Sequence, residues 1–508
     1  MRSRNTVINV ISVWMGQALI IVVNMIARKV FLQSLGNEYL GLNSLFTNIV
    51  SLLAVAELGF GNAINYNLYK PLAEGDTEAI KSLMRLYKRV YCSIGFFIIA
   101  IGLLIVPWIR DIAVSSEEIS NVELIFMMFV FNTAISYFFS YYGALITADQ
   151  KKYIFNISHY VFQFIMYLLQ IVFLLQYKNY YAYLICQMGA TVLENLVLTI
   201  VALKKYPYLK EKNVKQISKE NMSDIKKNVS SLILNKIGTS LVTSTDNILI
   251  TKLISLSVVG IYGNYSVIVT AVCNVFWQGI TAFTASIGNQ LVTGTKEAFR
   301  NIFYAVQLIG SWLYGWGCIC LFVLLTPFIR LWYGEYVLEL PIVLILCLNS
   351  YLSGQRTVLQ SYISAAGLYY NVRYRAIMEG ITNIILSIVL GKQFGLLGIL
   401  LGTFISGILC GWIPEAKVII NEILNISAKQ YVKMQVIDVS TILISGVITV
   451  WICEFIPQKG IPGFVINLCL CVLIPNIVML ILNCKNKAFL VCVEKAKVVL
   501  KNMKAGRI

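Results

Sequence analysis

The stretch YCSIGFFIIAIGLLIVPWI at residues 91–109 decides the fold class of this chain. A helix rises about 1.5 Å per residue, so about 20 apolar residues are enough to cross a hydrocarbon core of roughly 30 Å. Lys88 and Arg89 precede this stretch, and Arg110 follows it. Similar segments recur along the chain, which predicts an all-α integral membrane protein that crosses its membrane many times.

We predict about 14 transmembrane helices, and the positions of the basic residues predict how they are oriented. The N-terminus, every second connection and the C-terminal tail together hold 31 of the 41 Lys and Arg residues, whereas the other connections hold 8. Cytoplasmic connections are rich in Lys and Arg, so both termini are expected in the cytoplasm. The apolar segments begin near residues 8, 42, 91, 124, 154, 180, 231, 258, 303, 342, 375, 396, 434 and 462.

The composition excludes several classes of protein. Hydrophobic residues make up 58% of the chain and charged residues 13%. This composition is too apolar for a soluble globule. The net charge of +17 lies mainly on the predicted cytoplasmic side, which indicates contact with anionic membrane lipids and not with nucleic acid. The 12 cysteines include no CxxC motif, and His159 is the one histidine. We therefore expect no disulfide framework, no metal site and no cofactor.

An internal duplication is indicated by two matches at nearly the same spacing. LGNEYLGL at residues 35–42 aligns with ISLSVVGI at 254–261 at an offset of 219, and LITA at 145–148 aligns with ISAA at 363–366 at an offset of 218. Spans 1–6 would then repeat as spans 7–12. Since six is even, the two six-helix lobes would be related by a pseudo-twofold axis along the membrane normal, with two further C-terminal helices.

The domain boundaries follow from this repeat. We predict an N-terminal lobe at residues 1–203, a cytoplasmic linker at 204–228, a C-terminal lobe at 229–420, spans 13 and 14 at 421–484, and a basic cytoplasmic tail at 485–508. Residues 71–89 carry apolar side chains at helical spacing between basic ones, which is typical of an amphipathic helix lying at the membrane interface.

Charged residues at membrane depth are the candidates for function. Each costs roughly 2.5–3.5 kcal/mol at mid-span, so such residues usually face a cavity or a partner. Span 7 has a polar stripe formed by Lys236, Ser240, Thr243 and Asn247, and span 10 has one formed by Asn349, Ser353, Arg356 and Gln360. Span 7 also carries Asp246, which is about 15 Å from Lys236 along the helix and so cannot pair with it directly. Hydrogen bonding between packed helices is the alternative explanation of these stripes. Further candidates are Arg28, Glu57, Glu194 and Glu379, whereas Glu415 is expected to reach the inner interface.

No catalytic pattern accompanies these charges. The sequence lacks HExxH, GxSxG and a P-loop, and the predicted outer connections are too short for an extracellular domain. We therefore expect a protein that is not an enzyme and has no ATP site, so that its energy would come from an ion gradient or from its substrate.

These features together resemble the Wzx-type polysaccharide flippases of the multidrug/oligosaccharidyl-lipid/polysaccharide exporter superfamily. The resemblance rests on 14 predicted spans with both termini inside, Arg28 followed by LGNEYLGL, ELGFG at residues 57–61, and TDNILI at 245–250 leading to VGIY at 259–262. It covers most of the chain, most densely residues 1–290, and implies a multi-pass protein of the bacterial cytoplasmic membrane with two lobes around a central cavity.

The cargo that the resemblance implies is an undecaprenyl-diphosphate-linked oligosaccharide, moved by alternating access for capsule, O-antigen or exopolysaccharide synthesis. Its cavity cations Arg28, Lys236 and Arg356 would then bind the diphosphate, while Glu57, Asp246, Asn349 and Gln360 would line the cavity or couple transport to H⁺ or Na⁺. Membrane lipids, a polysaccharide polymerase and glycosyltransferases are the expected partners. Spans 13 and 14 would form a groove for the lipid tail, as in a related lipid II flippase.

Three other classes compete with this hypothesis. A cation-coupled multidrug exporter of the same superfamily is the main alternative, and its cationic cargo would favour acids and aromatic residues in the cavity over three cations. A membrane-bound polymerase or glycosyltransferase would need a substantial extramembrane loop with catalytic residues. A scaffolding protein would give no reason for charged stripes at mid-membrane.

Overall fold

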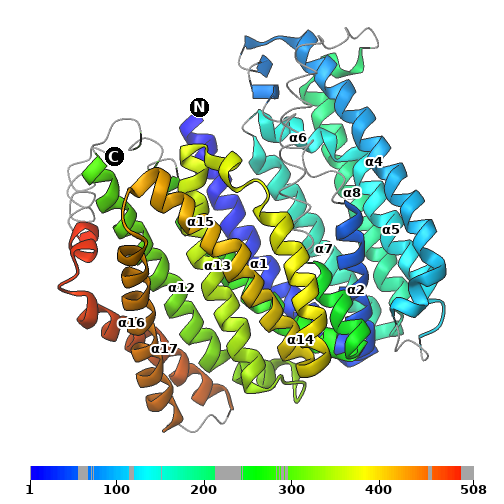
Figure 1. Ribbon diagram of the computed structural model, residues 1–508. Helices are drawn as coiled ribbons and strands as arrows, with labels where there is room; N and C mark the ends of the chain where they lie inside the picture. Colours follow the sequence, from blue (N-terminus) through cyan, green and yellow to red (C-terminus); the bar gives the residue numbers. More distant parts are fainter. Residues whose placement is uncertain are drawn as a thin grey trace. The chain divides into compact units, whose positions relative to one another are not determined.

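Helices are the regular secondary structure of the residues that the chain's computed structural model describes, with no strand among them (Figure 1). These are residues 2–54, 67–69, 71–72, 74–113, 119–149, 151–211, 242, 244–281, 283–284, 287, 291, 296–455 and 460–493, without the side chains of 2–15, 18, 296, 298 and 369. The chain divides into two compact units, Met1–Gly260 and Ile261–Ile508. The predicted lobe and linker boundaries stay predictions, and most of the 204–228 linker lies outside the described residues.

The first unit is a bundle of long helices. Helix α1 packs along α7, α7 along α8, α4 along α5, and α5 also contacts α8. The helices are α1 (Arg2–Leu35), α2 (Asn37–Leu53), α4 (Thr77–Ile112), α5 (Val122–Phe139), α6 (Tyr141–Ala148), α7 (Lys152–Tyr177), α8 (Tyr180–Lys205) and the short 3₁₀ turn η3 (Pro207–Lys210), and residues 244–253 are also helical.

The second unit is built around α12 and α13. Helix α12 packs on α13, α16 and α17, while α13 packs on α14. The elements are α12 (Lys296–Tyr333), α13 (Leu340–Ala366), η4 (Leu368–Val372), α14 (Arg375–Ser406), the π-helical η5 (Gly407–Trp412), α15 (Ile413–Val418), the π-helical η6 (Ile419–Leu424), α16 (Ala428–Glu454) and α17 (Gly460–Asn483). Helix α10 (Leu256–Thr281) begins in the first unit and continues into the second.

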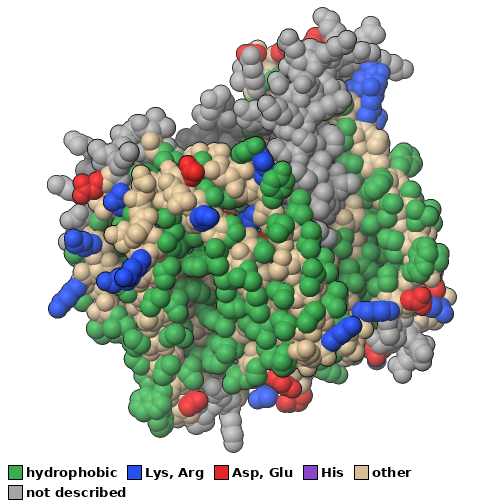
Figure 2. Space-filling view, in the orientation of Figure 1, with side chains coloured by type: hydrophobic (Ala, Val, Ile, Leu, Met, Phe, Trp, Pro, Cys, Tyr) green, Lys and Arg blue, Asp and Glu red, His purple; other side chains and the backbone are tan. Residues whose placement is uncertain are grey.

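Ten helical segments of the described chain are long and apolar enough to cross a membrane. One of them, Tyr370–Leu424, contains both span 11 and span 12 of the sequence prediction. Within it, Gly395 has a positive φ of 57° and breaks α14 one residue before the predicted start of span 12. Figure 2 shows hydrophobic side chains over the middle of the helices and charged ones toward their ends. The chain is thus an all-α, multi-pass membrane protein.

The amphipathic segment before span 3 differs from its prediction. Its apolar residues Ile80, Leu83, Met84 and Tyr87 are buried, as their helical spacing predicted. The separate interfacial helix over 71–89 is wrong, because α4 runs without interruption from Thr77 to Ile112. No glycine or proline interrupts the sequence from 77 to 94. Asp76 caps the N-terminus of α4, and no residue from 77 to 94 provides a signal that would end the helix.

Helix boundaries recur at the spacing that the sequence matches predicted. Helices α2 and α10 begin at an offset of 219 from each other, as do α4 and α12, while α5 and α13 begin at an offset of 218. Helix α4 packs on α5 just as α12 packs on α13. Matching starts and matching neighbours support an internal duplication.

The glycines of the repeated motif meet at one crossing in the first unit. A Cβ on Gly41 would lie 2.0 Å from the carbonyl oxygen of Leu256, and a Cβ on Gly260 would lie 2.5 Å from that of Asn37. Gly41 and Gly260 are separated by the same offset of 219 as Asn37 and Leu256. Gly41 of the first helix start therefore contacts Leu256 of the second, and Gly260 of the second contacts Asn37 of the first. Such a reciprocal contact is what a local two-fold relation between the two helix starts requires.

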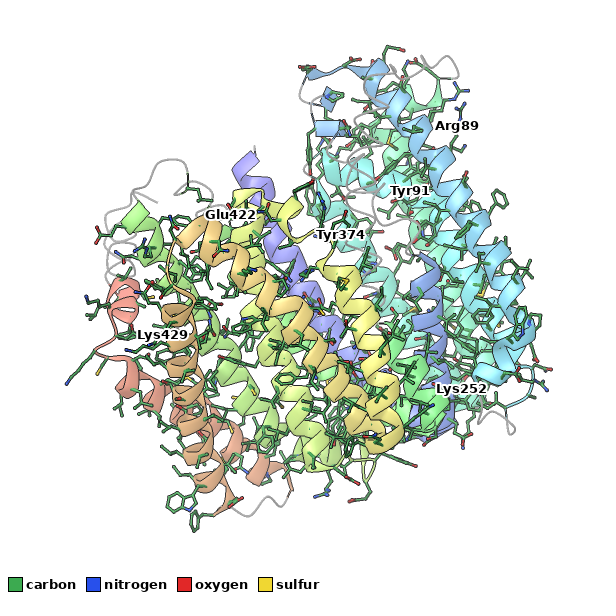
Figure 3. The ribbon with its side chains drawn as sticks, viewed as in Figure 1. Arg89, Tyr91, Lys252, Tyr374, Glu422 and Lys429 are labelled. Atoms are coloured by element: carbon green, nitrogen blue, oxygen red, sulfur yellow. The ribbon has the colours of Figure 1, made fainter. Side chains whose placement is uncertain are left out.

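Figure 3 labels residues in each of the two units. In the first unit Arg89 and Tyr91 lie toward one end and Lys252 toward the other, and in the second unit Tyr374 and Glu422 lie toward the same end as each other. Arg89 was predicted on the inner side and Lys252 on the outer side, so their separation agrees with the predicted alternation. Which end faces the cytoplasm stays a prediction.

Candidate functional site

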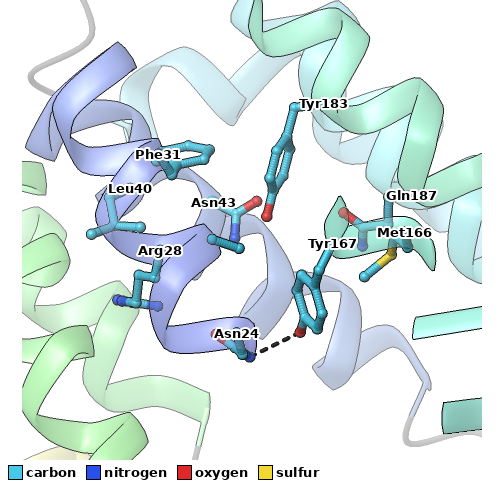
Figure 4. A pocket seen from close by; sticks show the side chains of 10 residues that line it. Asn24, Arg28, Phe31, Leu40, Asn43, Met166, Tyr167, Tyr183 and Gln187 are labelled. Atoms are coloured by element: carbon cyan, nitrogen blue, oxygen red, sulfur yellow. Dashed lines mark hydrogen bonds between the residues drawn. The ribbon is translucent and has the colours of Figure 1, made fainter. Parts of the chain in front are cut away.

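Arg28 lies in a cavity of the first unit. The cavity has a volume of about 170 Å³ and is lined by residues of α1, α2, α7 and α8. Arg28 sits on α1 seven residues before the helix ends, which corresponds to about two helical turns. Asn43 of α2, Tyr167 of α7, and Tyr183 and Gln187 of α8 line the same space (Figure 4).

The polar groups of this cavity are held in place by hydrogen bonds and ring contacts. The amide of Asn24 donates to the hydroxyl of Tyr167 at 2.8 Å, and the hydroxyl of Tyr180 donates to Asn43 Oδ1 at 3.2 Å. Phe31 makes edge-to-face contacts with Tyr180 at 5.7 Å and with Tyr183 at 4.9 Å between ring centroids. Since each ring is fixed by its neighbours, the tyrosine hydroxyls and amides are preorganised around the cavity.

The described residues that line the cavity carry one positive charge. Arg28 is the one charged residue among the described residues that line it, and the polar residues beside it are asparagine, glutamine and tyrosine. A guanidinium offers several N–H donors in a planar arrangement that suits phosphate and carboxylate groups. Amides and phenols offer donors and acceptors in addition. The cavity can therefore bind an anion together with neutral hydroxyl groups.

Arg356 has a different environment, a buried network of four charged side chains in the second unit. Its guanidinium donates to both carboxylate oxygens of Glu379, at 2.5 and 2.8 Å, and its Nε donates to Glu415 at 3.3 Å. Arg375 donates to Glu415 and lies 3.9 Å from Glu379. Gln360 donates to Glu415 at 2.9 Å. The two arginines and two glutamates balance in charge, with side chains only 1–15% exposed.

Local backbone structure makes room for this network. Residues 407–412 form a π-helical segment, a rare conformation that often occurs at functional positions. Within it, an added Cβ on Gly411 would lie 2.6 Å from the guanidinium carbon of Arg356, so the arginine packs directly on the helix backbone. Arg375 and Glu379 are four residues apart on α14 and so share a face.

Replacing Gly411 by alanine is expected to displace the Arg356 guanidinium and weaken its bonds to both glutamates. A fall of several degrees in the melting temperature of the purified protein should follow, since buried charges would lose part of their pairing. Gly446→Ala is the matched control, because the nearest atom to its added Cβ is 3.5 Å away. Equal melting temperatures for the two variants would contradict this account of Gly411.

A second polar network connects α12, α13 and α16. Gln307 donates to Gln355, whose own amide donates to Ser311 at 2.8 Å, and Ser311 donates to Asp438 at 3.0 Å. All four residues are buried. Asp438 therefore lies inside the helix packing of the second unit, on the face of α16 that also carries Gln435 and Thr441.

The remaining predicted site residues have separate positions. Asp246 is buried in the helical residues 244–253, and Asn349 donates to the carbonyl oxygen of Leu400 at 3.2 Å. Gln360 belongs to the Arg356 network. Glu57 and Lys236 lie outside the described residues. Among the described candidates, the structure thus brings Arg356 together with Glu379 and Gln360 and places Arg28 in a cavity. Their roles in substrate binding stay predictions.

Sequence reasoning missed several members of these sites. Glu415 was expected to reach the membrane interface, but it is 1% exposed and bonded to Arg356. Arg375 was not among the predicted site residues, although its spacing of four from Glu379 was a usable signal. Tyr167 and Tyr183 carried no signal, because a tyrosine within an apolar helix does not show from sequence which face it occupies.

Comparison with solved structures identifies the fold class. The chain is similar to the lipid II flippase MurJ in an inward closed conformation, with 13% identity and a TM-score of 0.66 over 94% of this chain and 99% of that one. It is also similar to an inward-facing multidrug resistance MATE family transporter of the MOP superfamily, with 13% identity and a TM-score of 0.62 over 82% of this chain and 99% of that one.

A third similar structure is a MOP superfamily transporter from Pyrococcus furiosus. The binding pocket of that transporter has a reverse polarity, which is described as suggesting a different function for it. It is 12% identical, with a TM-score of 0.55 over 82% of this chain and 96% of that one. No family model matches the sequence, and no curated protein matches it. At this level of identity the likeness establishes that the chain has the fold of MOP superfamily transport proteins.

Proposed function

We propose that this protein is a flippase that moves undecaprenyl-diphosphate-linked oligosaccharide repeat units across the cytoplasmic membrane of a bacterium by alternating access. The product would serve capsule, O-antigen or exopolysaccharide synthesis. The observation that carries this proposal is the cavity around Arg28, which combines one cation with neutral polar side chains. The similarity in fold to a lipid II flippase agrees with it.

The chemistry of the cavity suits the head of such a lipid. A diphosphate cannot cross hydrocarbon unaided, and a half-buried guanidinium provides charge-assisted hydrogen bonds in a region of low dielectric. Asn24, Asn43 and Gln187 provide neutral partners for sugar hydroxyls. The cavity volume of about 170 Å³ is small for a whole ligand. Sites for drug-sized molecules are larger, so this one fits a part of the lipid such as the diphosphate or one sugar.

The main alternative is a cation-coupled multidrug exporter, and the sign of the charge argues against it. A cationic drug needs an acid or an open aromatic face in its site. The described residues that line the Arg28 cavity include no acid, and two of the rings around it, Phe31 and Tyr183, pack against other rings. An arginine at this position would repel a cationic cargo.

Coupling to an ion gradient is a further part of the proposal. Asp246 is a buried carboxylate close to the start of α10 in sequence, and such a group can exchange H⁺ or Na⁺ when a helix moves. Lys236 and Glu57 are proposed as cavity residues from sequence alone. A polysaccharide polymerase and glycosyltransferases are the partners that this function implies.

The proposal predicts selective binding by the purified protein. A polyprenyl-diphosphate disaccharide at about 100 times its dissociation constant should stabilise the folded state by about 2.7 kcal/mol and raise the melting temperature by a few degrees. A neutral glycolipid without phosphate and a monovalent cationic dye should have little effect. Stabilisation by the dye and not by the diphosphate lipid would favour the exporter and reject the flippase.

A further inference from the structure

The second unit contains another cavity, of about 300 Å³, whose described lining includes no residue of the Arg356 network. It is bounded by α12, by the beginning of α16 and by the residues that follow α17. The sequence places these ends of α16 and α17 on the cytoplasmic side. In Figure 2, Lys and Arg side chains gather over the part of this unit where α16 begins. Lys429, which is labelled in Figure 3, lies at this beginning of α16.

The rim of this cavity is basic. Lys433 of α16 and Lys487 after α17 both line it, and the amide side chains of Gln430 and Asn486 lie beside them. Both lysines are exposed, so their ammonium groups are available to a ligand from solvent or from the membrane surface. The lining residues carry two positive charges and one negative charge, from Asp438, which gives a net charge of +1.

The walls of the cavity are apolar, and the end of the cavity that lies farther along α16 than Lys433 carries the acid Asp438. Leu308, Met434 and Ile437 form walls on α12 and α16. Asp438 accepts a hydrogen bond from Ser311 at 3.0 Å. It lies more than one helical turn beyond Lys433 along α16. An anionic group would therefore bind at the lysine end, where attraction is strongest and the carboxylate is farthest away.

The surface next to the cavity is suited to acyl chains. Beyond Ile437, the outward face of α16 carries Val439, Leu443, Ile444 and Val447, and Val447 is 69% exposed. A ligand with a phosphate between two lysines and hydrocarbon chains along this face would match both parts of the site. Basic pockets between transmembrane helices on the cytoplasmic side commonly bind anionic lipid headgroups.

We propose that this cavity binds the phosphate of an anionic phospholipid from the inner leaflet, with Lys433 and Lys487 holding the headgroup and the apolar face of α16 holding the acyl chains. This site is distinct from the Arg28 cavity, and it does not depend on the proposed flippase function. The ligand shares its phosphate chemistry with the transported lipid, so the experiment must separate the two.

The test is native mass spectrometry of the full-length protein with phosphatidylglycerol and phosphatidylcholine. Wild type should retain phosphatidylglycerol in preference to phosphatidylcholine. The double variant Lys433→Gln with Lys487→Gln should bind phosphatidylglycerol about tenfold or more weakly, because two cations are lost from the membrane surface. The matched control is Lys429→Gln with Lys485→Gln, which removes the same charge from the same segments at positions that do not line the cavity.

The possible outcomes separate the proposal from its rivals. Equal loss in the two double variants would overturn it, since only general surface charge would then be involved. Equal retention of the two phospholipids by wild type would also overturn it, since the anionic headgroup would then not be recognised. Displacement of phosphatidylglycerol by an equal amount of polyprenyl diphosphate would assign the cavity to the transported lipid and would also overturn it. Inorganic phosphate at millimolar concentration should not displace phosphatidylglycerol, because it lacks chains for the apolar face; displacement by it would likewise contradict the proposal.

Discussion

Arg28→Ala is expected to lower transport of the lipid-linked oligosaccharide by about 10- to 100-fold at limiting substrate. The change removes charge-assisted hydrogen bonds worth roughly 1.5–3 kcal/mol from the substrate complex, while the surrounding amides and phenols keep their own contacts. The amount of protein in the membrane should change little, because Arg28 is half-buried at the cavity wall and not in the packed core. Export of polysaccharide in cells and the protein level in isolated membranes measure the two effects.

Two control variants sharpen this prediction. Lys29→Ala removes the neighbouring cation, which does not line the cavity, and should leave transport nearly unchanged. Arg28→Lys keeps the charge but loses the planar donor geometry, so it should retain part of the activity if charge alone matters and little if bidentate binding matters. Equal loss in the Lys29 and Arg28 alanine variants would argue against a specific role for the cavity.

Arg356→Ala is expected to destabilise the protein by about 3–5 kcal/mol, the usual cost of breaking a buried ion pair. It would leave Glu379 and Glu415 buried with only Arg375 to balance them. The melting temperature and the yield of folded protein should both fall. Arg356→Met combined with Glu379→Gln, which keeps the network neutral, should recover part of the loss because the two positions are coupled.

The same variants decide between two roles for Arg356. Normal protein levels with loss of transport in Arg356→Ala would support the sequence-based assignment of this residue to the diphosphate. Reduced protein levels with partial recovery in the double variant would place Arg356 in the internal support of the second unit. Its contacts favour the second role, since both glutamates already bind its guanidinium.

Much of the fold could be predicted from sequence because membranes impose simple rules. The apolar segments that begin near residues 375 and 396 lie on the two sides of the break at Gly395. The duplication was detectable because the motif around Gly41 and Gly260 has kept its spacing, and glycine tolerates the close approach there. The continuous α4 was missed because basic residues suggested an interface where the helix simply extends beyond the apolar stretch.

The site was harder to predict, for physical reasons. A charge within an apolar helix indicates that it must find a partner, but it does not identify the partner. Arg356 was found in this way, whereas Glu415 was set aside because Pro414 and a position near a helix end suggested exposure. The neutral residues around Arg28 come from four helices, and the contacts among those helices depend on packing that one sequence does not reveal.

The most direct test of the account is a flipping measurement in proteoliposomes that contain only this protein. A fluorescent undecaprenyl-diphosphate disaccharide would be placed in both leaflets, and its exposure to an impermeant quencher would be followed over time. The account predicts that wild type and Lys29→Ala make the inner-leaflet pool accessible, and that Arg28→Ala does so about 10- to 100-fold more slowly. No acceleration by wild type, together with uptake of a cationic dye driven by a proton or sodium gradient, would contradict it.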